Sequence, residues 1–130
     1  MSPELHISLS NLQSNIQFFQ RIIKKNTELS AVVKSDAYGL GIAKIVPEIE
    51  RYGVRCFFTA TISEAIKVRS YSRDSEIFTL NGFDFLKSNL YREHNITPII
   101  NNILEAQKFI EIFNQTQKVA IQLNTGMNRL

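Results

Sequence analysis

Residues 31–41 of the chain read AVVKSDAYGLG, an apolar run that ends in a lysine and continues into a segment with two glycines. β-Branched residues favour strands, whereas glycine and aspartate favour turns, so residues 31–33 predict a buried strand and residues 35–41 a loop. Lys34 would then lie at the carboxyl end of that strand. In α/β proteins, functional side chains gather at the carboxyl ends of parallel strands. The stretch therefore predicts a strand and makes Lys34 a candidate functional residue.

The first β-rich run spans residues 29–34, and four more runs rich in Val, Ile, Phe and Thr follow it at residues 54–61, 75–80, 96–100 and 118–123. Apolar residues at helical spacing lie between most of these runs. Strands that alternate with helices predict an α/β domain with a parallel sheet, because crossovers of this length can join parallel strands. This periodicity alone does not distinguish a doubly wound sheet from a (β/α) barrel. Since no helix pattern follows the fifth run, we expect an incomplete fold with two open sheet edges.

The sequence also predicts where some helices begin. Ser10 or Asn11 would cap the first helix and Ser63 the helix after the second strand, because such side chains accept hydrogen bonds from free backbone N–H groups. Pro47 lies in the apolar stripe between the first two strands, so that helix either kinks at Pro47 or begins there. Residues 84–91 could form only a short helix.

Lysine has a specific use at the end of a buried strand. Its free amine, with a pKa of about 10.4, is a poor nucleophile at neutral pH, but burial lowers that value. A desolvated lysine can form a Schiff base with an aldehyde cofactor and then exchange protons. Position and composition alone favour the simpler interpretation of Lys34, a strand-end lysine that reaches into solvent.

Three further features near the predicted strand ends have chemical potential. The phenol of Tyr38 could donate a hydrogen bond to a phosphate, although an isolated loop tyrosine is more often only half-buried. Gly39 and Gly41 suit a tight turn into a helix N-terminus, which is a good anion site, but the third glycine of a dinucleotide fingerprint is missing. Residues 124–129, NTGMNR, end in Arg129, whose guanidinium could bind a carboxylate or a phenolate. Taken alone, this segment is better explained as a surface turn.

Composition and charge exclude several other classes of protein. The net charge of +3 is spread thinly, with Lys24–Lys25 as the only adjacent basic pair, so we expect no nucleic-acid interface. No apolar run reaches the length of a membrane span, and the N-terminus lacks the pattern of a secretory signal, which together predict a cytoplasmic protein. Cys56 lies beside two phenylalanines, as a core residue would. His6 and His94 lack ligands at metal-binding spacing, so we expect no metal site.

Taken together, AVVKSDAYGLG at residues 31–41 and LNTGMNRL at residues 123–130 resemble alanine racemases closely. In that family the first segment lies on the first barrel strand and a segment like the second follows the fifth strand. FFTATISEA at residues 57–65 and IFTLNG at residues 77–82 also resemble the family. The resemblance therefore covers essentially the whole chain, and it overturns the simpler interpretation of Lys34.

The resemblance implies that residues 1–130 are the N-terminal portion, about five βα units, of a (β/α)8 barrel that binds pyridoxal phosphate. A β-rich C-terminal domain would follow, and the full-length enzyme would be a homodimer. Lys34 would carry the cofactor through an imine and would act as one catalytic base. Tyr38 would contact the cofactor phosphate, and Arg129 would lie near the phenolic oxygen of the cofactor and the substrate carboxylate.

The reaction implied by the resemblance is the interconversion of L-alanine and D-alanine, which supplies D-alanine for bacterial peptidoglycan. The second base of the family is a tyrosine from the C-terminal domain of the partner subunit. Because residues 1–130 do not reach that domain, we expect them to be inactive alone.

Two positions depart from the pattern of the family. Leu40 stands where many members have histidine, which leaves the lysine chemistry unchanged. Gln122 stands where some members have a lysine that becomes carbamylated, so Arg129 must be positioned differently, for instance by the Gln122 amide.

Three other hypotheses compete with an active racemase. A barrel-type amino-acid decarboxylase is disfavoured by the AYGLG segment at residues 37–41. A non-catalytic barrel protein of pyridoxal phosphate homeostasis is disfavoured by the Thr-Gly-Met-x-Arg segment at residues 125–129. A truncated, inactive gene product is compatible with the sequence.

Overall fold

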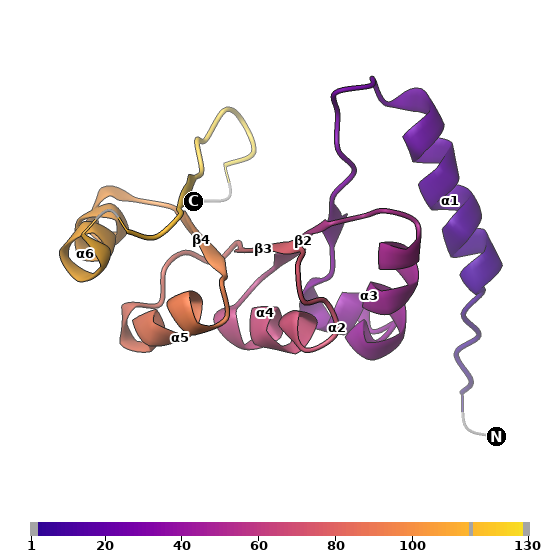
Figure 1. Ribbon diagram of the computed structural model, residues 1–130, viewed down its shortest axis with the longest axis horizontal. Coiled ribbons are helices and arrows are strands. Elements are labelled where there is room, and N and C mark those ends of the chain that lie inside the picture. The colour runs from indigo at the N-terminus through magenta and orange to yellow at the C-terminus, as the bar shows by residue number, and fades with distance from the viewer. Residues whose placement is uncertain (1–2, 115, 129–130) are drawn as a thin grey trace.

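The structure is a computed structural model that describes residues 3–114 and 116–128. Helices alternate with five strands along these residues (Figure 1). The strands are β1 (Ala31–Val32), β2 (Cys56–Thr59), β3 (Glu76–Thr79), β4 (Thr97–Ile100) and β5 (Ala120–Ile121). The helices are α1 (Leu9–Ile22), α2 (Lys34–Tyr38), α3 (Ile42–Arg51), α4 (Ile62–Arg69), the 3-10 turn η1 (Phe85–Lys87), α5 (Ser88–Glu93) and α6 (Ile103–Phe113).

All five strands belong to one sheet in the order β1-β2-β3-β4-β5, and each adjacent pair is parallel. Helices α3, α4 and α5 lie in a row along one side of this sheet (Figure 1). A doubly wound sheet reverses its strand order at a switch point, whereas a (β/α) barrel keeps the order of the chain. The observed order confirms the predicted fold class, a portion of a (β/α) barrel.

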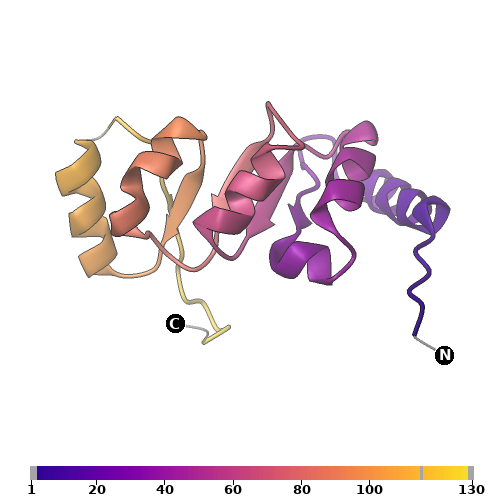
Figure 2. The same cartoon turned by 90° about the horizontal axis from the view of Figure 1, so that it is seen from below.

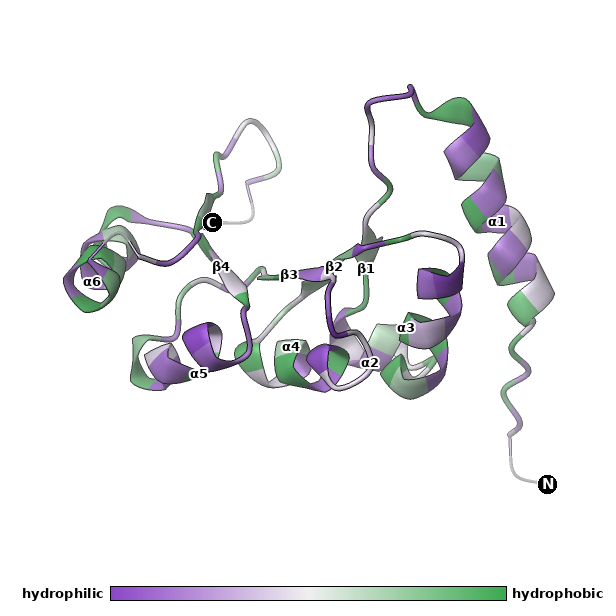
Figure 3. Ribbon diagram, in the orientation of Figure 1, coloured by the Kyte–Doolittle hydropathy of each residue, from purple (hydrophilic) through white to green (hydrophobic). Residues whose placement is uncertain are grey.

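The main core lies between the sheet and its helices. Phe57 of β2 and Ile77 of β3 are paired in register and fully buried there, together with apolar residues of the flanking helices. Apolar and polar residues alternate along α1, α3 and α6, as expected for helices that bury one side; α1 packs on α3 (Figure 3). On the opposite face of the sheet, the rings of Phe58 and Phe78 stack with their centroids 5.0 Å apart. Alternate residues of each strand therefore separate the helix-side core from the face that lines a barrel.

Two predicted helix starts are wrong by two or three residues. Helix α1 is capped by Ser8, whose side chain accepts from the N–H of Asn11, and not by Ser10 or Asn11. Helix α4 is capped by Thr61 instead of Ser63. Capping residues of the same type stand close together in the sequence in both cases, so composition does not select one of them.

Pro47 lies inside α3, which begins five residues earlier at Ile42. The turn that precedes α3, described below, fixes its first residue. Among residues 3–114 and 116–128, no helix combines the length with the apolar character that a membrane crossing requires.

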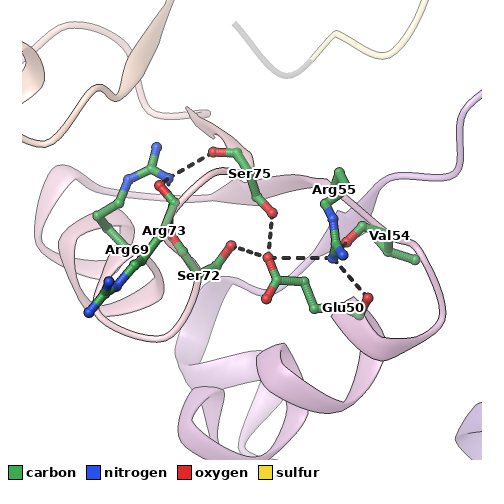
Figure 4. A network of polar contacts seen from close by, with 7 residues as sticks. All are labelled: Glu50, Val54, Arg55, Arg69, Ser72, Arg73 and Ser75. Carbon is green, nitrogen blue, oxygen red and sulfur yellow. Dashed lines mark hydrogen bonds and ion pairs between the residues drawn. The ribbon is translucent and has the colours of Figure 1, made fainter.

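The connections at the amino edge of the sheet are joined by two charged side chains. Oε1 of Glu50, at the end of α3, accepts hydrogen bonds from Ser72 Oγ at 2.5 Å and Ser75 Oγ at 2.7 Å (Figure 4). Arg55 Nη1 lies 3.6 Å from the same oxygen. These contacts hold the segment before β3 against the end of α3.

Arg69, in the last turn of α4, makes the second set of contacts at this edge. Its guanidinium lies 2.7–3.1 Å from five backbone carbonyl oxygens, those of Ser72, Arg73, Ser75, His94 and Asn95. Burial lowers the pKa of Arg69, against the opposing influence of Asp74 and Glu50. In barrels this edge serves stability, while the opposite edge serves function.

Candidate active site

Lys34 directly follows the strand pairing of β1. The N–H of Val33 donates to the carbonyl of Phe58 at 2.8 Å, and Lys34 is the next residue, with its side chain partly buried. Because β1 runs parallel to β2, this position is at the carboxyl edge of the sheet. The structure therefore confirms the predicted placement of Lys34.

Tyr38 lies one helical turn beyond Lys34. The Nζ of Lys34 is 5.9 Å from the centroid of the Tyr38 ring, and the Tyr38 side chain is 62% exposed. The structure thus brings an amine and an accessible phenol together at the edge where barrels carry their functional groups. Because the Tyr38 side chain is largely exposed and Lys34 is only partly buried, both side chains are accessible to a ligand.

The segment after Lys34, predicted as a loop, is a single turn of left-handed helix. Ser35, Asp36, Ala37 and Tyr38 have φ values of 53° to 56°. The turn is closed by hydrogen bonds from Ala37 N–H to Val33 and from Gly39 N–H to Ser35, each at 2.9 Å. Left-handed helix is unfavourable by roughly 1–2 kcal/mol for each residue with a Cβ, and such strain clusters at functional sites.

Contacts with neighbouring elements offset this strain. Ala37 is buried in the core, and Oδ1 of Asp36 accepts hydrogen bonds from the Ile42 N–H at 3.0 Å and from Lys67 Nζ at 2.8 Å. The hydrogen bond from Lys67, together with that from Ile42, lowers the pKa of Asp36. The predicted turn at Gly39 and Gly41 is present, with φ values of 84° and 91°. The Ile42 N–H at the start of α3, which an anion could otherwise have bound, is engaged by Asp36.

Glu64 also contacts this turn, and sequence reasoning missed it. Its two carboxylate oxygens accept hydrogen bonds at 2.8 Å, one from the N–H of Ser35 and the other from the N–H of Ala60. Its own N–H donates to Thr61 Oγ1 at 3.3 Å. The Thr-x-x-Glu spacing at residues 61–64 is a capping-box pattern and was the available signal. The contact with Ser35 could not be read from it, because Ser35 is 29 residues away in the sequence.

The predicted substrate residue Arg129 lies outside the described residues. The segment that leads to it follows β5 and lies at the same edge of the sheet as the turn after Lys34 (Figure 2). Asn124 Oδ1 accepts from the N–H groups of Gly126 and Asn128, at 3.2 and 3.0 Å, which forms a compact turn. The Gln122 side chain is partly buried at the end of β5. The described residues of the second motif, 123–128, therefore lie at the same edge as the turn after Lys34.

Residues 7–130 match the family described as alanine racemase, N-terminal domain. The chain belongs to the alanine racemase family. An alanine racemase from Methylobacterium nodulans is 36% identical over 106 residues, which are 79% of this chain and 29% of that protein. An amino-acid racemase from Enterococcus faecalis is 33% identical over 124 residues, which are 95% of this chain and 18% of that protein.

A solved structure has the same fold. The alanine racemase from Bartonella henselae with covalently bound pyridoxal phosphate superposes with a TM-score of 0.86 at 31% identity, over 95% of this chain and 37% of that one. The chain thus spans less than two fifths of the length of each of these three racemases. The carboxyl edge described above belongs to the N-terminal domain of the family.

Other residues considered from the sequence lie away from this edge or in the core. Cys56 is buried, as predicted, and burial raises the pKa of its thiol. Exposed His6 lies 3.3 Å from Glu4 near the N-terminus, and His94 follows α5. Within the described part of this racemase domain, no three His, Cys, Asp or Glu side chains gather as metal ligands would.

Proposed function

We propose that residues 1–130 form the first part of the barrel of a pyridoxal-phosphate-dependent racemase that interconverts L-alanine and D-alanine. The observation that carries the proposal is Lys34 at the carboxyl end of β1, beside Tyr38, within the segment AVVKSDAYGLG. The match over residues 7–130 supports the amino-acid racemase class. Alanine as substrate, a homodimer, a cytoplasmic location and the supply of D-alanine for peptidoglycan are parts of the same proposal.

The side chains at the edge fit the chemistry of the cofactor. Lys34 offers a primary amine, which is the group that an aldehyde cofactor needs for covalent attachment. Tyr38 offers a phenolic O–H on an accessible ring, which can donate to a phosphate oxygen. Pyridoxal phosphate, when bound, supplies an electron sink for the charge that remains after an α-proton leaves the amino acid.

Each residue then has a separate task. Lys34 would hold the cofactor through its amine, and the same amine, when free, would take the α-proton from one face of the amino acid or return it to that face. Arg129 binds the substrate carboxylate through its guanidinium fork. A second base has to act on the opposite face, and we propose that it comes from a partner subunit. The left-handed turn and its contacts keep the Lys34 backbone fixed while the amine moves.

The experiment is Lys34→Ala in the full-length enzyme. Alanine offers no amine, so the variant should lose the visible absorbance of the lysine-bound cofactor and the production of D-alanine from L-alanine. Lys44→Ala, on the exposed side of α3, is the matched control and should retain both. Full visible absorbance in the Lys34→Ala variant would assign the cofactor to another lysine and contradict the proposal.

A further inference from the structure

The carboxylate of Glu64 lies between the two strands nearest to Lys34. It accepts from the N–H of Ser35, which belongs to the peptide bond formed by the Lys34 carbonyl, and from the N–H of Ala60 at the end of β2. Both distances are 2.8 Å, and the Glu64 side chain is partly buried. Charge-assisted hydrogen bonds of this kind are about twice as strong as neutral ones.

The position of the Ser35 N–H gives this contact its importance. The chain leaves the β-ladder at Val33 and enters left-handed backbone at Ser35, whose φ is 53°. Val33, whose ψ of 22° already departs from extended backbone, and Lys34 connect these two conformations. A carboxylate that holds the Ser35 N–H therefore fixes the direction in which the Lys34 backbone leaves the strand, and with it the starting point of the Lys34 side chain.

Glu105 makes a closely similar set of contacts around β3 and β4. Its Oε2 accepts from the N–H of Asn101, at the end of β4, at 3.0 Å, and from the N–H of Phe83, after β3, at 3.3 Å. Its own N–H donates to the capping side chain of Asn102 at 2.9 Å. The two segments, TISEA at residues 61–65 and NILEA at residues 102–106, share their pattern. In each segment the glutamate is the third residue of a helix. Its carboxylate joins the end of the strand before that helix to the loop that follows the neighbouring strand.

Comparing Glu64 with Glu105 separates two roles of such a carboxylate, stabilising two neighbouring loops and fixing the backbone beside Lys34. Both glutamates stabilise two neighbouring loops. Only Glu64 contacts the residue next to Lys34, since the corresponding partner of Glu105 is Phe83. An effect on the lysine that Glu64 has and Glu105 lacks is therefore attributed to the contacts of Glu64 beside Lys34, of which the hydrogen bond from Ser35 is the nearest in the chain.

We infer that Glu64 is a positioning residue for Lys34: its carboxylate holds the Lys34–Ser35 peptide against the end of β2, so that the amine is presented to the cofactor from a fixed backbone. The inference rests on the proposed function, because the labelling of Lys34 by pyridoxal phosphate is one of its tests. Glu64 would act by fixing the Lys34–Ser35 peptide and not by changing the charge of Lys34.

The experiment compares Glu64→Gln with Glu105→Gln in the full-length enzyme. In Glu64→Gln the NH2 group replaces one of the two acceptor oxygens, so one of the hydrogen bonds from Ser35 and Ala60 is lost. In Glu105→Gln the amide oxygen can keep both backbone donors, which share Oε2, and the bond that is lost is the one from Asn102 Nδ2 to Oε1. Two properties are measured: hydrogen exchange of the Ser35 amide in the apo-protein, and the rate at which added pyridoxal phosphate becomes fixed to Lys34 on borohydride reduction, followed by peptide mass spectrometry. Glu64→Asp, which keeps the charge but shortens the side chain, provides a second variant if Glu64→Gln folds poorly.

We expect Glu64→Gln and Glu64→Asp to accelerate exchange at Ser35 by about tenfold, as loss of one hydrogen bond of typical net strength would, and to slow labelling of Lys34 by a similar factor. Glu105→Gln should leave both properties within about twofold of the wild type, since its partner peptide is at Phe83. Equal slowing of Lys34 labelling by Glu64→Gln and Glu105→Gln, or unchanged exchange at Ser35, would overturn this inference alone. Absence of labelling at Lys34 in the wild type would contradict the proposed function and this inference with it.

Discussion

The Nζ of Lys67 on α4 lies 2.8 Å from Oδ1 of Asp36, so an ion pair joins α4 to the left-handed turn after Lys34. Both side chains are about half exposed. The hydrogen bond between them lowers the pKa of Asp36 and raises that of Lys67. The Asp36 contribution to stability is therefore present above the usual pKa of an aspartate and is lost as the pH falls through its lowered value. The Lys67 contribution is present below the usual pKa of a lysine and is lost as the pH rises through its raised value.

Lys67→Met should raise the pKa of Asp36 toward that of a free aspartate. The hydrogen bond from Ile42 remains in the variant, so the pKa should stay somewhat below the free value. The Asp36 carboxyl carbon, titrated by NMR at low pH, reports the midpoint directly. Lys108→Met, which removes a distant ion pair with Glu111 on α6, is the control and should not move it. An unchanged Asp36 midpoint in Lys67→Met would show that the ion pair does not form in solution.

Arg69→Lys should destabilise the fold although it keeps the positive charge. A single ammonium cannot reach the carbonyls before β3 and those before β4 together, so buried acceptors would lose their donors. We expect a loss of about 3 kcal/mol in the free energy of unfolding, measured by urea denaturation. Arg51→Lys, whose exposed side chain pairs with the largely buried Glu48, keeps one charged donor for that carboxylate and should change it by less than about 1 kcal/mol. A similar small change in Arg69→Lys would mean that water replaces the guanidinium at no cost.

Gly82→Ala should disrupt the contacts of Glu105. Gly82 has a φ of +88°, and a Cβ there would lie 2.6 Å from Glu105 Oε1 and 2.7 Å from Oε2. The carboxylate would have to move away from the N–H groups of Phe83 and Asn101. Together with the left-handed backbone, this predicts a loss of roughly 2–3 kcal/mol in the free energy of unfolding.

A double-mutant cycle tests this explanation of Gly82. In a Glu105→Gln background, part of the hydrogen bonding is already lost, so Gly82→Ala should be less unfavourable than in the wild type. Strictly additive losses in the urea midpoints would show that Gly82 is required only for its backbone conformation.

Residues 1–130 alone should not racemise alanine. β1 and β5 are the edge strands of the described sheet, and Val32 and Ile121 on them are 46% and 71% exposed. Such edges favour aggregation, and an open pocket admits water to the lysine. The assay is D-alanine formation from L-alanine with added pyridoxal phosphate, followed with a stereospecific oxidase, beside the full-length enzyme. D-alanine production by residues 1–130 that is lost in Lys34→Ala would show that these residues already contain the required groups.

The sequence was sufficient to predict the strands and the location of Lys34, because both depend on local patterns. Alternating β-rich and helical segments indicated a parallel sheet, and Lys34 follows one of those strands directly. The left-handed turn was not predictable in the same way. Positive φ is unfavourable for Ser35 and Ala37, and aspartate adopts it only as a single residue, so the sequence gives no signal for a run of such residues. Contacts of Ser35 with Glu64 and of Asp36 with Lys67, about thirty residues away, stabilise the turn.

The role of Glu64 illustrates the same limit at the candidate site. The Thr-x-x-Glu pattern at residues 61–64 is a local signal for the start of α4, although Ser63 and not Thr61 was expected as its cap. That the carboxylate also contacts the residue after Lys34 depends on the sheet having formed, with β1 beside β2. Residues that act through contacts between distant parts of the chain can be recognised only once the positions of the strands are known.

The side-chain contacts at the two edges of the sheet differ from one strand pair to the next, which has a mechanical consequence. At the carboxyl edge, Glu64 joins the ends of β1 and β2, and Glu105 those of β3 and β4. At the amino edge, Glu50 joins the connections that lead into β2 and β3, and Arg69 those that lead into β3 and β4. A force that separates β1 from β2 would therefore load the Glu64 carboxylate, whereas a force that separates β3 from β4 would load Glu105 and Arg69 at opposite edges together. Pulled by its two ends, the sheet should therefore release β1 from β2 before it releases β4 from β3.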